Sequence, residues 1–202
     1  MAETGVGDGL IAQIVKLGAH ELEAFQDQLQ SVYAEAFAEP PYNRREGDVL
    51  AFERQLLRHA TYPDFRCLAA LSEDDGRVLG FAYGYTGVPG QWWHDQISAR
   101  MDPELAREWL PDHFELVELA VSPHAQGGGI GGRLHDALLA GLPHPTACLS
   151  TSQLETTALR MYRKRGWVVL LDNFYFSSGG LPYLIMGKRL RPAGRSSQSA
   201  SI

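Results

Sequence analysis

A run of glycines in the middle of the chain, Gln126-Gly-Gly-Gly-Ile-Gly-Gly132, constrains the fold more than any other sequence feature. An apolar, strand-like stretch at 114–121 precedes it, and residues 130–140 follow with apolar side chains at helical spacing. Glycine lets the backbone approach a ligand closely and present consecutive N–H groups. The free amides at the start of a helix, at the positive end of its dipole, bind anions. The segment therefore predicts a strand, a turn and a helix whose N-terminus holds a phosphate-bearing ligand.

Other kinds of glycine-rich loop fit this segment less well. Gly127, Gly129 and Gly132 satisfy the dinucleotide pattern G-x-G-x-x-G, but residues 122–126 separate them from the strand that they should follow directly. A nucleotide P-loop ends in Gly-Lys-Ser/Thr, whereas here Arg133 follows Gly132. A turn without any ligand would lose conformational entropy with no packing in return. The pattern favours a pyrophosphate loop of a different kind.

The rest of the chain alternates between strand and helix patterns. Residues 88–113 are irregular and aromatic, and Asp74-Asp75-Gly76 is a hairpin signal between two strands. Strands are predicted at 10–17, 65–71, 78–86, 114–121, 146–150, 167–171 and 183–190, and helices at 20–37, 46–59, 130–140 and 154–165. The strands form a meander first and alternate with helices later. This order predicts a mixed sheet with helices on its faces, of the α/β or α+β class.

The length of 202 residues predicts one domain that can bury a full core. We expect this domain at 10–190, with no internal repeat and no interior linker. Residues 1–9 are polar and glycine-rich and are expected to be flexible. The small polar residues of 191–202 are expected to form a disordered tail.

Charge and cysteine content limit the partners and the compartment. Lys and Arg number 18 and Asp and Glu 24, so the net charge is −6, which provides no basic surface for nucleic acid or an anionic membrane. Cys67 and Cys148 form neither a disulfide framework nor a metal-type motif, so no metal is expected. The N-terminal residues lack the order of a signal peptide, and no apolar run approaches the roughly 18 residues of a membrane span. A cytoplasmic protein is expected.

Two segments carry a family resemblance. The sequence Leu119-Ala-Val-Ser-Pro-His-Ala-Gln-Gly-Gly-Gly-Ile-Gly131 resembles the GNAT superfamily of N-acetyltransferases, whose signature Gln/Arg-x-x-Gly-x-Gly/Ala is matched by Gln126, Gly129 and Gly131. Downstream, Glu155-Thr-Thr-Ala-Leu-Arg-Met-Tyr-Arg-Lys-Arg-Gly-Trp167 is similar to the family helix Asn-x-x-Ala-x-x-Leu-Tyr-x-x-x-Gly-Phe. The match includes Tyr162, and Glu155 stands where the family often has Asn.

The resemblance implies a GNAT-like, mostly antiparallel central sheet of about six to seven strands, flanked by helices and splayed at the acetyl-CoA site. It implies transfer of acetyl from acetyl-CoA to a primary amine by direct attack in a ternary complex. The pantetheine arm would pair with the backbone of β-strand residues, and the pyrophosphate would bind the glycine loop. The cofactor-binding residues so implied are Leu119, Ala120, Val121, Gln126, Gly127, Gly128, Gly129, Ile130, Gly131 and Gly132.

The resemblance also implies catalytic residues. Tyr162 matches the tyrosine that protonates the leaving thiolate. Similar enzymes place a general base at the position of Glu115, and some place an acidic substrate ligand at that of Glu118. The two glutamates would point to opposite faces of a regular strand, unless a bulge intervenes. Burying a glutamate without a partner is costly, so at least one is expected to be functional. The sequence leaves open which of them is the base.

The acceptor is the least determined part of the prediction. An aromatic wall for a cationic or apolar acceptor is one interpretation of Tyr42, Tyr83, Tyr85, Trp92 and Trp93, and two tryptophans that clamp a loop are another. The aromatic and glycine-rich residues 174–180 could line the acceptor mouth or a homodimer contact. His124 is expected to be exposed and His135 structural. A small-molecule amine or a peptide amine is expected as acceptor.

A second hypothesis is a GNAT-like domain that binds acyl-CoA without turnover, as a sensor or partner module. Such a domain need not keep both Tyr162 and a strand glutamate, and this chain has both.

Overall fold

The structure, a computed structural model, describes residues 12–190. The two ends predicted to be flexible, 1–9 and 191–202, lie outside the described residues. In chain order, the elements are β1 (Ala12–Leu17), α1 (Ala19–Phe37), α2 (Glu46–His59), β2 (Arg66–Ser72), β3 (Val78–Gly87), α3 (Trp92–Ser98), α4 (Pro103–Trp109), β4 (His113–Val121), η1 (Pro123–Ala125), α5 (Ile130–Leu139), β5 (Thr146–Ser152), α6 (Thr157–Lys164), β6 (Val168–Phe174) and β7 (Tyr183–Arg189).

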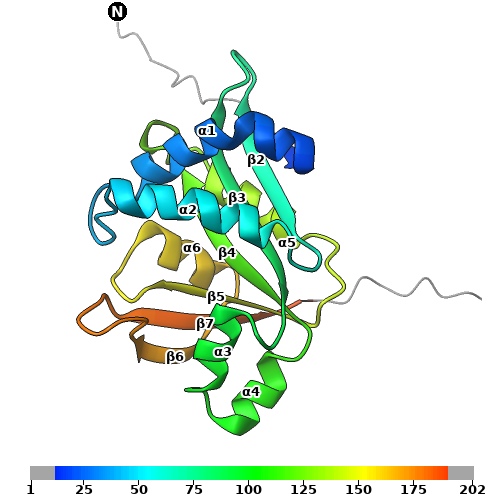
Figure 1. The fold of residues 1–202 in the computed structure, drawn as a ribbon, viewed down its shortest axis with the longest axis vertical. Helices are drawn as coiled ribbons and strands as arrows, with labels where there is room; N and C mark the ends of the chain where they lie inside the picture. Colours follow the sequence, from blue (N-terminus) through cyan, green and yellow to red (C-terminus); the bar gives the residue numbers. More distant parts are fainter. Residues whose placement is uncertain (1–11, 191–202) are drawn as a thin grey trace, which may run out of the picture. The chain divides into compact units, whose positions relative to one another are not determined.

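The described strands form a seven-stranded sheet in the order β1-β2-β3-β4-β5-β7-β6 (Figure 1). The pairs β1–β2, β5–β7 and β6–β7 are antiparallel, whereas β4 and β5 are parallel. The predicted mixed, mostly antiparallel sheet flanked by helices is confirmed. No helix among residues 12–190 is long and apolar enough to cross a membrane.

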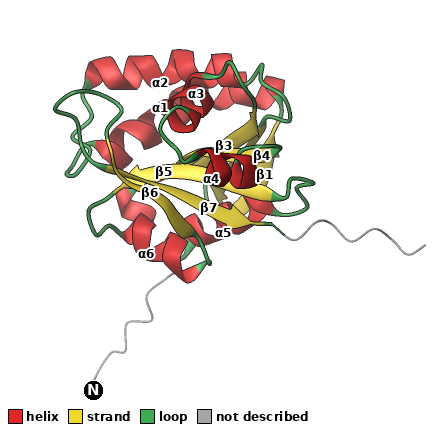
Figure 2. Ribbon diagram, turned by 90° about the horizontal axis from the view of Figure 1, so that it is seen from below, coloured by secondary structure: helices red, strands yellow, loops and turns green. Residues whose placement is uncertain are grey.

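The described chain divides into two compact units, and the division runs through β3 and β4. The first unit contains residues 12–60, Arg66–Tyr83 and Glu118–Leu138. Within it, α1 and α2 lie on one side of the strands and α5 on the other (Figure 2). The stacked rings of Tyr33 and Phe52 join α1 to α2, with 4.1 Å between their ring centres. The ring centres of Phe52 and Phe81 of β3 are 5.6 Å apart. Aromatic packing therefore holds the two helices on the face to which the odd-numbered residues of β3 point.

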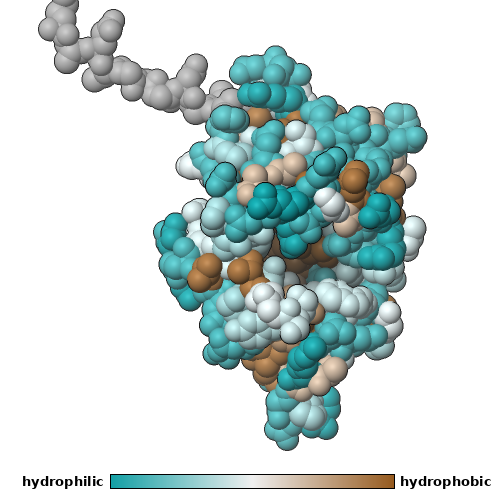
Figure 3. Space-filling view, turned by 60° about the vertical axis from the view of Figure 1, so that its left-hand side comes forward, coloured by the Kyte–Doolittle hydropathy of each residue, from teal (hydrophilic) through white to brown (hydrophobic). Residues whose placement is uncertain are grey.

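The second unit contains Thr61–Phe65, Gly84–Val117 and residues 139–190. Its core gathers buried residues of α3, β5 and β7 around Ile97, Cys148 and Ile185. Large apolar side chains are also exposed in this unit: Trp92, Leu154, Val168, Val169 and Tyr175. Figure 3 shows one face of the molecule, on which hydrophobic patches interrupt a mostly hydrophilic surface.

The structure corrects two of the predicted segments. Residues 88–113, predicted to be irregular, contain α3 and α4, which have seven residues each and are too short to show a clear apolar period. Asp102 caps α4 by accepting hydrogen bonds from the amides of Glu104 and Leu105. The helix predicted at 154–165 is shorter, because the Thr156 side chain accepts from the amide of Leu159 and caps a helix that begins at Thr157.

Candidate functional site

The glycine loop has the backbone conformation that its sequence predicts. Gly127 and Gly129 have positive φ values of 87° and 80°, which other residues adopt only under strain. A Cβ atom placed on either residue would meet nothing within 4 Å. Backbone conformation, and not crowding inside the protein, therefore requires glycine here. The open space outside these Cα atoms would let a ligand come close to the backbone.

The loop ends where α5 offers free backbone amides. The amide of Arg133 donates to the carbonyl of Gly129 at 3.1 Å, which is the first hydrogen bond of this helix. The N–H groups of Ile130, Gly131 and Gly132 precede that bond and have no acceptor inside the helix. Together with the helix dipole, these groups favour an anion. The structure thus gathers six of the predicted cofactor residues, Gly127, Gly128, Gly129, Ile130, Gly131 and Gly132, in one loop and helix start.

Upstream of this loop, β4 turns one edge toward β3. The amide of Ser122 donates to the Leu79 carbonyl of β3 at 2.9 Å. Because successive residues of a strand direct their N–H and C=O groups to alternate edges, Leu119 and Val121 direct theirs away from β3. The carbonyl of Val121 accepts a hydrogen bond from Nε2 of Gln126 at 3.0 Å. Gln126 therefore joins the glycine loop to the end of β4.

The pairing of β4 with β5 is short. It runs over three residue pairs, from His113 and Thr146 to Glu115 and Cys148. Both strands continue beyond the last pair, β4 to Val121 and β5 to Ser152. Glu115 therefore occupies the last paired position of β4, and Leu116–Val121 follow without a partner in the described part of β5.

β4 contains a bulge that the sequence allowed but did not establish. The Glu115 side chain is hydrogen-bonded to Tyr85, which lies on the odd-numbered face of β3. Six residues later, the Val121 side chain packs at Gly80, on the even-numbered face. Residues six apart in a regular strand point to the same face, so the alternation shifts by one residue between these positions.

In the first unit, Glu118 lies on the face of the strands that α1 and α2 cover. Ser122, next to Val121, donates through Oγ to Glu35 of α1 at 2.7 Å, so it points to the helix-covered face. Glu118 has the same parity as Ser122 and interacts electrostatically with Arg44, which lies between α1 and α2. The shift therefore falls between Glu115 and Glu118, and the expectation for a regular strand does not hold.

Glu115 is closed off from solvent. Its exposed fraction is 3%, and Oε2 has no hydrogen-bond partner among the described residues. Burial raises the pKa of this carboxyl group to about 8, although the hydrogen bond from Tyr85 opposes the shift. Burial and the neighbouring Glu115 also raise the pKa of the Cys148 thiol. At neutral pH, both groups hold their protons.

Glu118 has a more open setting. Its side chain is partly exposed, yet loss of hydration raises the pKa of its carboxyl group to about 7. The charge of Arg44 and a hydrogen bond from the amide of Leu119 favour the ionised form and limit the shift. Arg44 is also 3.6 Å from Asp48. The result is a carboxyl group that can both gain and lose a proton near neutral pH.

Tyr162 lies on α6 with an exposed fraction of 5%. Its ring meets that of Trp167 edge to face at 5.8 Å, a contact that fixes the ring plane. Near the start of the same helix, Glu155 forms an ion pair with Arg163 at 2.6 Å. The residue that departs from the family pattern therefore lies just before α6 and is paired with a residue of that helix.

The aromatic candidates divide into buried and exposed residues. Tyr83, Tyr85 and Trp93 are buried, and Nε1 of Trp93 donates to the Ser150 hydroxyl of β5 at 3.3 Å. Trp92 is 60% exposed and stacks on Phe176 at 5.3 Å. The five residues predicted as a possible aromatic wall, Tyr42, Tyr83, Tyr85, Trp92 and Trp93, therefore do not form an open wall together.

Sequence reasoning missed two residues that set the charge of the glutamates. Tyr85 appeared only as an aromatic candidate, although its hydroxyl bonds Glu115, and Arg44 was not considered. The pairing of β3 with β4 could have suggested the first, because a tyrosine beside a buried carboxyl group is a natural donor.

The histidines behave as expected. His124 is exposed, and His135 is buried on α5 with Nδ1 2.7 Å from Asp136. Residues 12–190 contain no group of three or more His, Cys, Asp or Glu side chains that could hold a metal ion.

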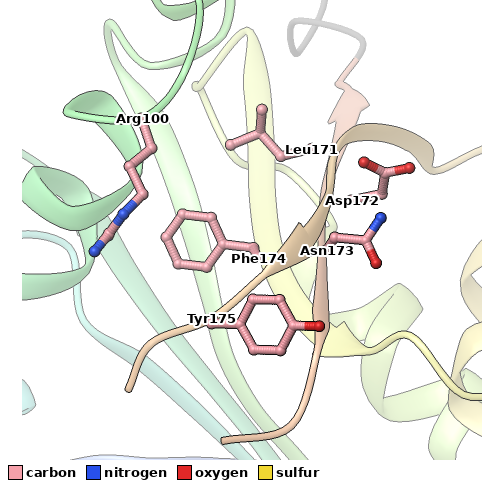
Figure 4. A pocket seen from close by; sticks show the side chains of 6 residues that line it. All are labelled: Arg100, Leu171, Asp172, Asn173, Phe174 and Tyr175. Atoms are coloured by element: carbon pink, nitrogen blue, oxygen red, sulfur yellow. The ribbon is translucent and has the colours of Figure 1, made fainter. Parts of the chain in front are cut away.

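A pocket of about 300 Å³ lies in the second unit, beside the end of β6 (Figure 4). Its lining residues are Arg100, Leu171, Asp172, Asn173, Phe174 and Tyr175. The guanidinium of Arg100 is 5.0 Å from the centre of the Phe174 ring, a cation–π contact. None of the predicted catalytic or cofactor residues lines this pocket.

Comparison with known proteins agrees with this geometry. The profile of the acetyltransferase (GNAT) family matches residues 22–167. The GCN5-like protein acetyltransferase Rv2170 of Mycobacterium tuberculosis is 34% identical over 151 residues, which cover 70% of this chain and 73% of that protein.

Solved structures show the same fold at lower identity. The ribosomal-protein-S18-alanine N-acetyltransferase of Escherichia coli has a TM-score of 0.59 and 17% identity, over 92% of this chain and 98% of that one. A ribosomal-protein-alanine N-acetyltransferase of Brucella melitensis has a TM-score of 0.61 and 21% identity, over 88% and 99%. The family match covers well over half of the sequence, and the chain belongs to the acetyltransferase (GNAT) family.

Proposed function

We propose that the protein transfers the acetyl group of acetyl-CoA to a primary amine of a polypeptide, by direct attack in a ternary complex. Family membership supplies the acetyltransferase activity, and GNAT enzymes generally use acetyl-CoA as the donor. The amine and the mechanism are the proposal. The single observation that carries it is Glu118, a partly exposed strand carboxyl group whose pKa is raised to about 7.

The glycine loop and β4 would bind the cofactor. The amides of Gly127–Gly132 suit a pyrophosphate, since they are unused by the helix and lie at the positive end of its dipole. The edge of β4 at Leu119 and Val121 suits the amide-rich pantetheine arm, because its backbone groups point away from β3. The main-chain N–H of Leu119, which points away from β3, would donate to the thioester oxygen as negative charge develops on it.

Glu118 is the stronger candidate for the general base. An amine is protonated at neutral pH and must lose a proton before it can attack. A base works best when its pKa is near the working pH, which the setting of Glu118 provides. Glu115 is closed to solvent and protonated at neutral pH, so it is poorly suited to accept that proton. We therefore assign the role of general base to Glu118, and protonation of the leaving thiolate to Tyr162.

The proposed class of acceptor rests on the substrate class of a related protein and on the net charge of this chain. The Mycobacterium tuberculosis relative is named a protein acetyltransferase, and we extend that substrate class to this chain. A net charge of −6 favours the approach of a cationic amine, such as a lysine side chain. Lysine peptides are therefore the first acceptors to test, with a polyamine and a free amino acid as comparisons.

The test measures release of coenzyme A thiol from acetyl-CoA with each acceptor, and binding of acetyl-CoA by calorimetry. We expect release with a lysine peptide, and a fall of about 100-fold or more in Glu118→Gln, which removes the base. Glu155→Gln is the matched control, because it makes the same change on an exposed carboxylate paired with Arg163. Binding of acetyl-CoA without release for any acceptor would favour the non-catalytic module instead.

A further inference from the structure

The turn that leads from β4 into the glycine loop is attached to α1 by a side-chain hydrogen bond. Oγ of Ser122 donates to Oε2 of Glu35 at 2.7 Å. The two residues are 87 positions apart in the sequence, and both belong to the first unit. Ser122 is the residue that directly follows β4. The bond therefore fixes the position of α1 relative to the start of the turn.

The hydroxyl of Ser122 is not used inside its own turn. Ser122 is the N-cap residue of the short helix η1, and a serine at an N-cap usually accepts a hydrogen bond from an amide two or three residues later. Here the side chain makes no capping bond. The backbone closes the turn instead, because the amide of Ala125 donates to the Ser122 carbonyl at 2.8 Å. The side chain is thus free to make a contact with another element.

Glu35 is well placed to accept this hydroxyl. Its other oxygen, Oε1, accepts from Oγ of Ser31 at 3.2 Å, one turn earlier on α1. A hydroxyl that donates to a carboxylate forms a short and strong hydrogen bond, which the 2.7 Å distance to Ser122 matches. Glu35 lies in the last turn of α1, where the helix dipole disfavours an anion. Its placement is therefore explained by its partner on β4 and not by the helix.

The glycine segment depends on the ends of its turn for its position. The amide of Ser122 donates to the Leu79 carbonyl of β3, and Nε2 of Gln126 donates to the Val121 carbonyl. Residues 127–129 follow directly, and a Cβ on any of them would meet nothing within 4 Å. A glycine segment without packing of its own has wide conformational freedom. The bonds at Ser122 and Gln126 therefore restrict it.

We propose that Glu35 is a positioning residue for the cofactor loop, which holds Ser122 so that the glycine segment already has its binding conformation before acetyl-CoA arrives. The role rests on the proposed function, because it takes the loop as the pyrophosphate site. Without the bond, the loop would adopt the binding conformation only part of the time, and the apparent affinity would fall by that fraction. The groups that take part in the chemistry would stay unchanged.

Calorimetry with acetyl-CoA tests this role in Glu35→Ala and in Ser122→Ala. We expect Kd to rise about 10-fold in each, which corresponds to a binding conformation that is populated about a tenth of the time. KM for acetyl-CoA should rise by a similar factor, while kcat should change less than about twofold. Chemical denaturation without ligand checks that both variants are folded under the assay conditions. A lower kcat with an unchanged KM would contradict a positioning role.

Ser31→Ala is the matched control. It removes the other hydroxyl that is bonded to Glu35 but leaves the bond between Oε2 and Ser122. Its Kd for acetyl-CoA should stay within about twofold of the wild-type value. The double variant Glu35→Ala/Ser122→Ala should bind no more weakly than either single variant, because both changes remove the same bond. Losses that add in the double variant, or a Ser31→Ala that equals Glu35→Ala, would overturn the proposal.

The binding measurements separate this role from the proposed function. A protein that shows the expected affinities but transfers no acetyl group to any amine keeps the positioning role and overturns the proposed function. An active enzyme whose Kd for acetyl-CoA is unchanged in Glu35→Ala overturns the positioning role alone. A wild-type protein that binds no acetyl-CoA overturns both.

Discussion

Changing Tyr162 to phenylalanine would remove only the hydroxyl group of this buried ring. The ring packs against Trp167, and phenylalanine would keep that contact. We expect Tyr162→Phe to lower turnover about 100-fold, because the leaving thiolate loses its proton donor. Acetyl-CoA affinity and thermal stability should change little. Steady-state kinetics and calorimetry measure the two effects separately, and an unchanged turnover would remove Tyr162 from the mechanism.

Glu118 should set the acid limb of the activity profile. Only its ionised form accepts a proton, so kcat/KM should rise as pH increases through about 7. Arg44 favours the ionised form, and Arg44→Gln should therefore move this limb to higher pH. Arg45→Gln, a change at the neighbouring exposed arginine, is the matched control. A limb that stays in place in Arg44→Gln would show that another group controls it.

At the scale of elements, the turn from β4 into α5 depends on backbone conformation. Gly129 has a φ of 80°, where a side chain costs about 1–2 kcal/mol. Gly129→Ala should lose about that much unfolding free energy without ligand and should weaken acetyl-CoA binding. Gly128 also has open space around its Cα, but its φ is not positive. Gly128→Ala should therefore keep the stability of the ligand-free protein, as chemical denaturation would measure. Equal losses in both variants would contradict a role for φ.

At the centre of β3, glycine is needed because the backbone lies very close to β4. A Cβ at Gly84 would overlap the Glu115 carbonyl oxygen and the Phe114 ring. Gly84→Ala should therefore destabilise the protein by about 3 kcal/mol through overpacking. Gly47→Ala is the control, since Gly47 lies in the first turn of α2 with nothing within 4 Å. It should be neutral or stabilise by up to about 1 kcal/mol. A tolerated alanine at Gly84 would contradict this close packing.

The sequence predicted elements well where a repeating pattern was long enough. The bounds of α2 match the prediction, and α1 begins one residue earlier than expected. The helices α3 and α4 were missed because seven residues hold two turns, too few for an apolar period. Asp102-Pro103 is a helix-start signal that could have revealed α4. Local apolar patterns therefore predict the long elements. Short helices depend instead on capping residues and on packing.

At the scale of the whole molecule, the candidate site was predictable only in part. The glycine loop is local in sequence, so motif and conformation agree there. The protonation of Glu115 and Glu118 depends on residues from other elements, Tyr85 and Arg44. The shift in side-chain alternation along β4 depends on how β4 pairs with β3. Sequence spacing carries neither kind of information, because both arise from tertiary contacts.

Acid should destabilise the folded protein through His113. Burial lowers the pKa of this ring to about 4, against about 6.5 for an exposed histidine, and His94, His144 and Asp112 are the charged or titratable groups that act on it. The unfolded chain therefore binds the proton more readily between these values, so unfolding free energy falls as pH falls through this window. The loss from this one group is about 3 kcal/mol.

His113→Gln should flatten this dependence, and His124→Gln, a change at an exposed histidine, should not. Denaturant unfolding at a series of pH values measures both. If His113→Gln does not fold, the ring can be titrated by NMR in the wild-type protein, where it should stay neutral down to about pH 4. Glu115 acts in the opposite direction, because its raised pKa makes its contribution vanish as pH increases through about 8. A His113 ring that protonates near pH 6.5 in the folded state would contradict the expected acid sensitivity.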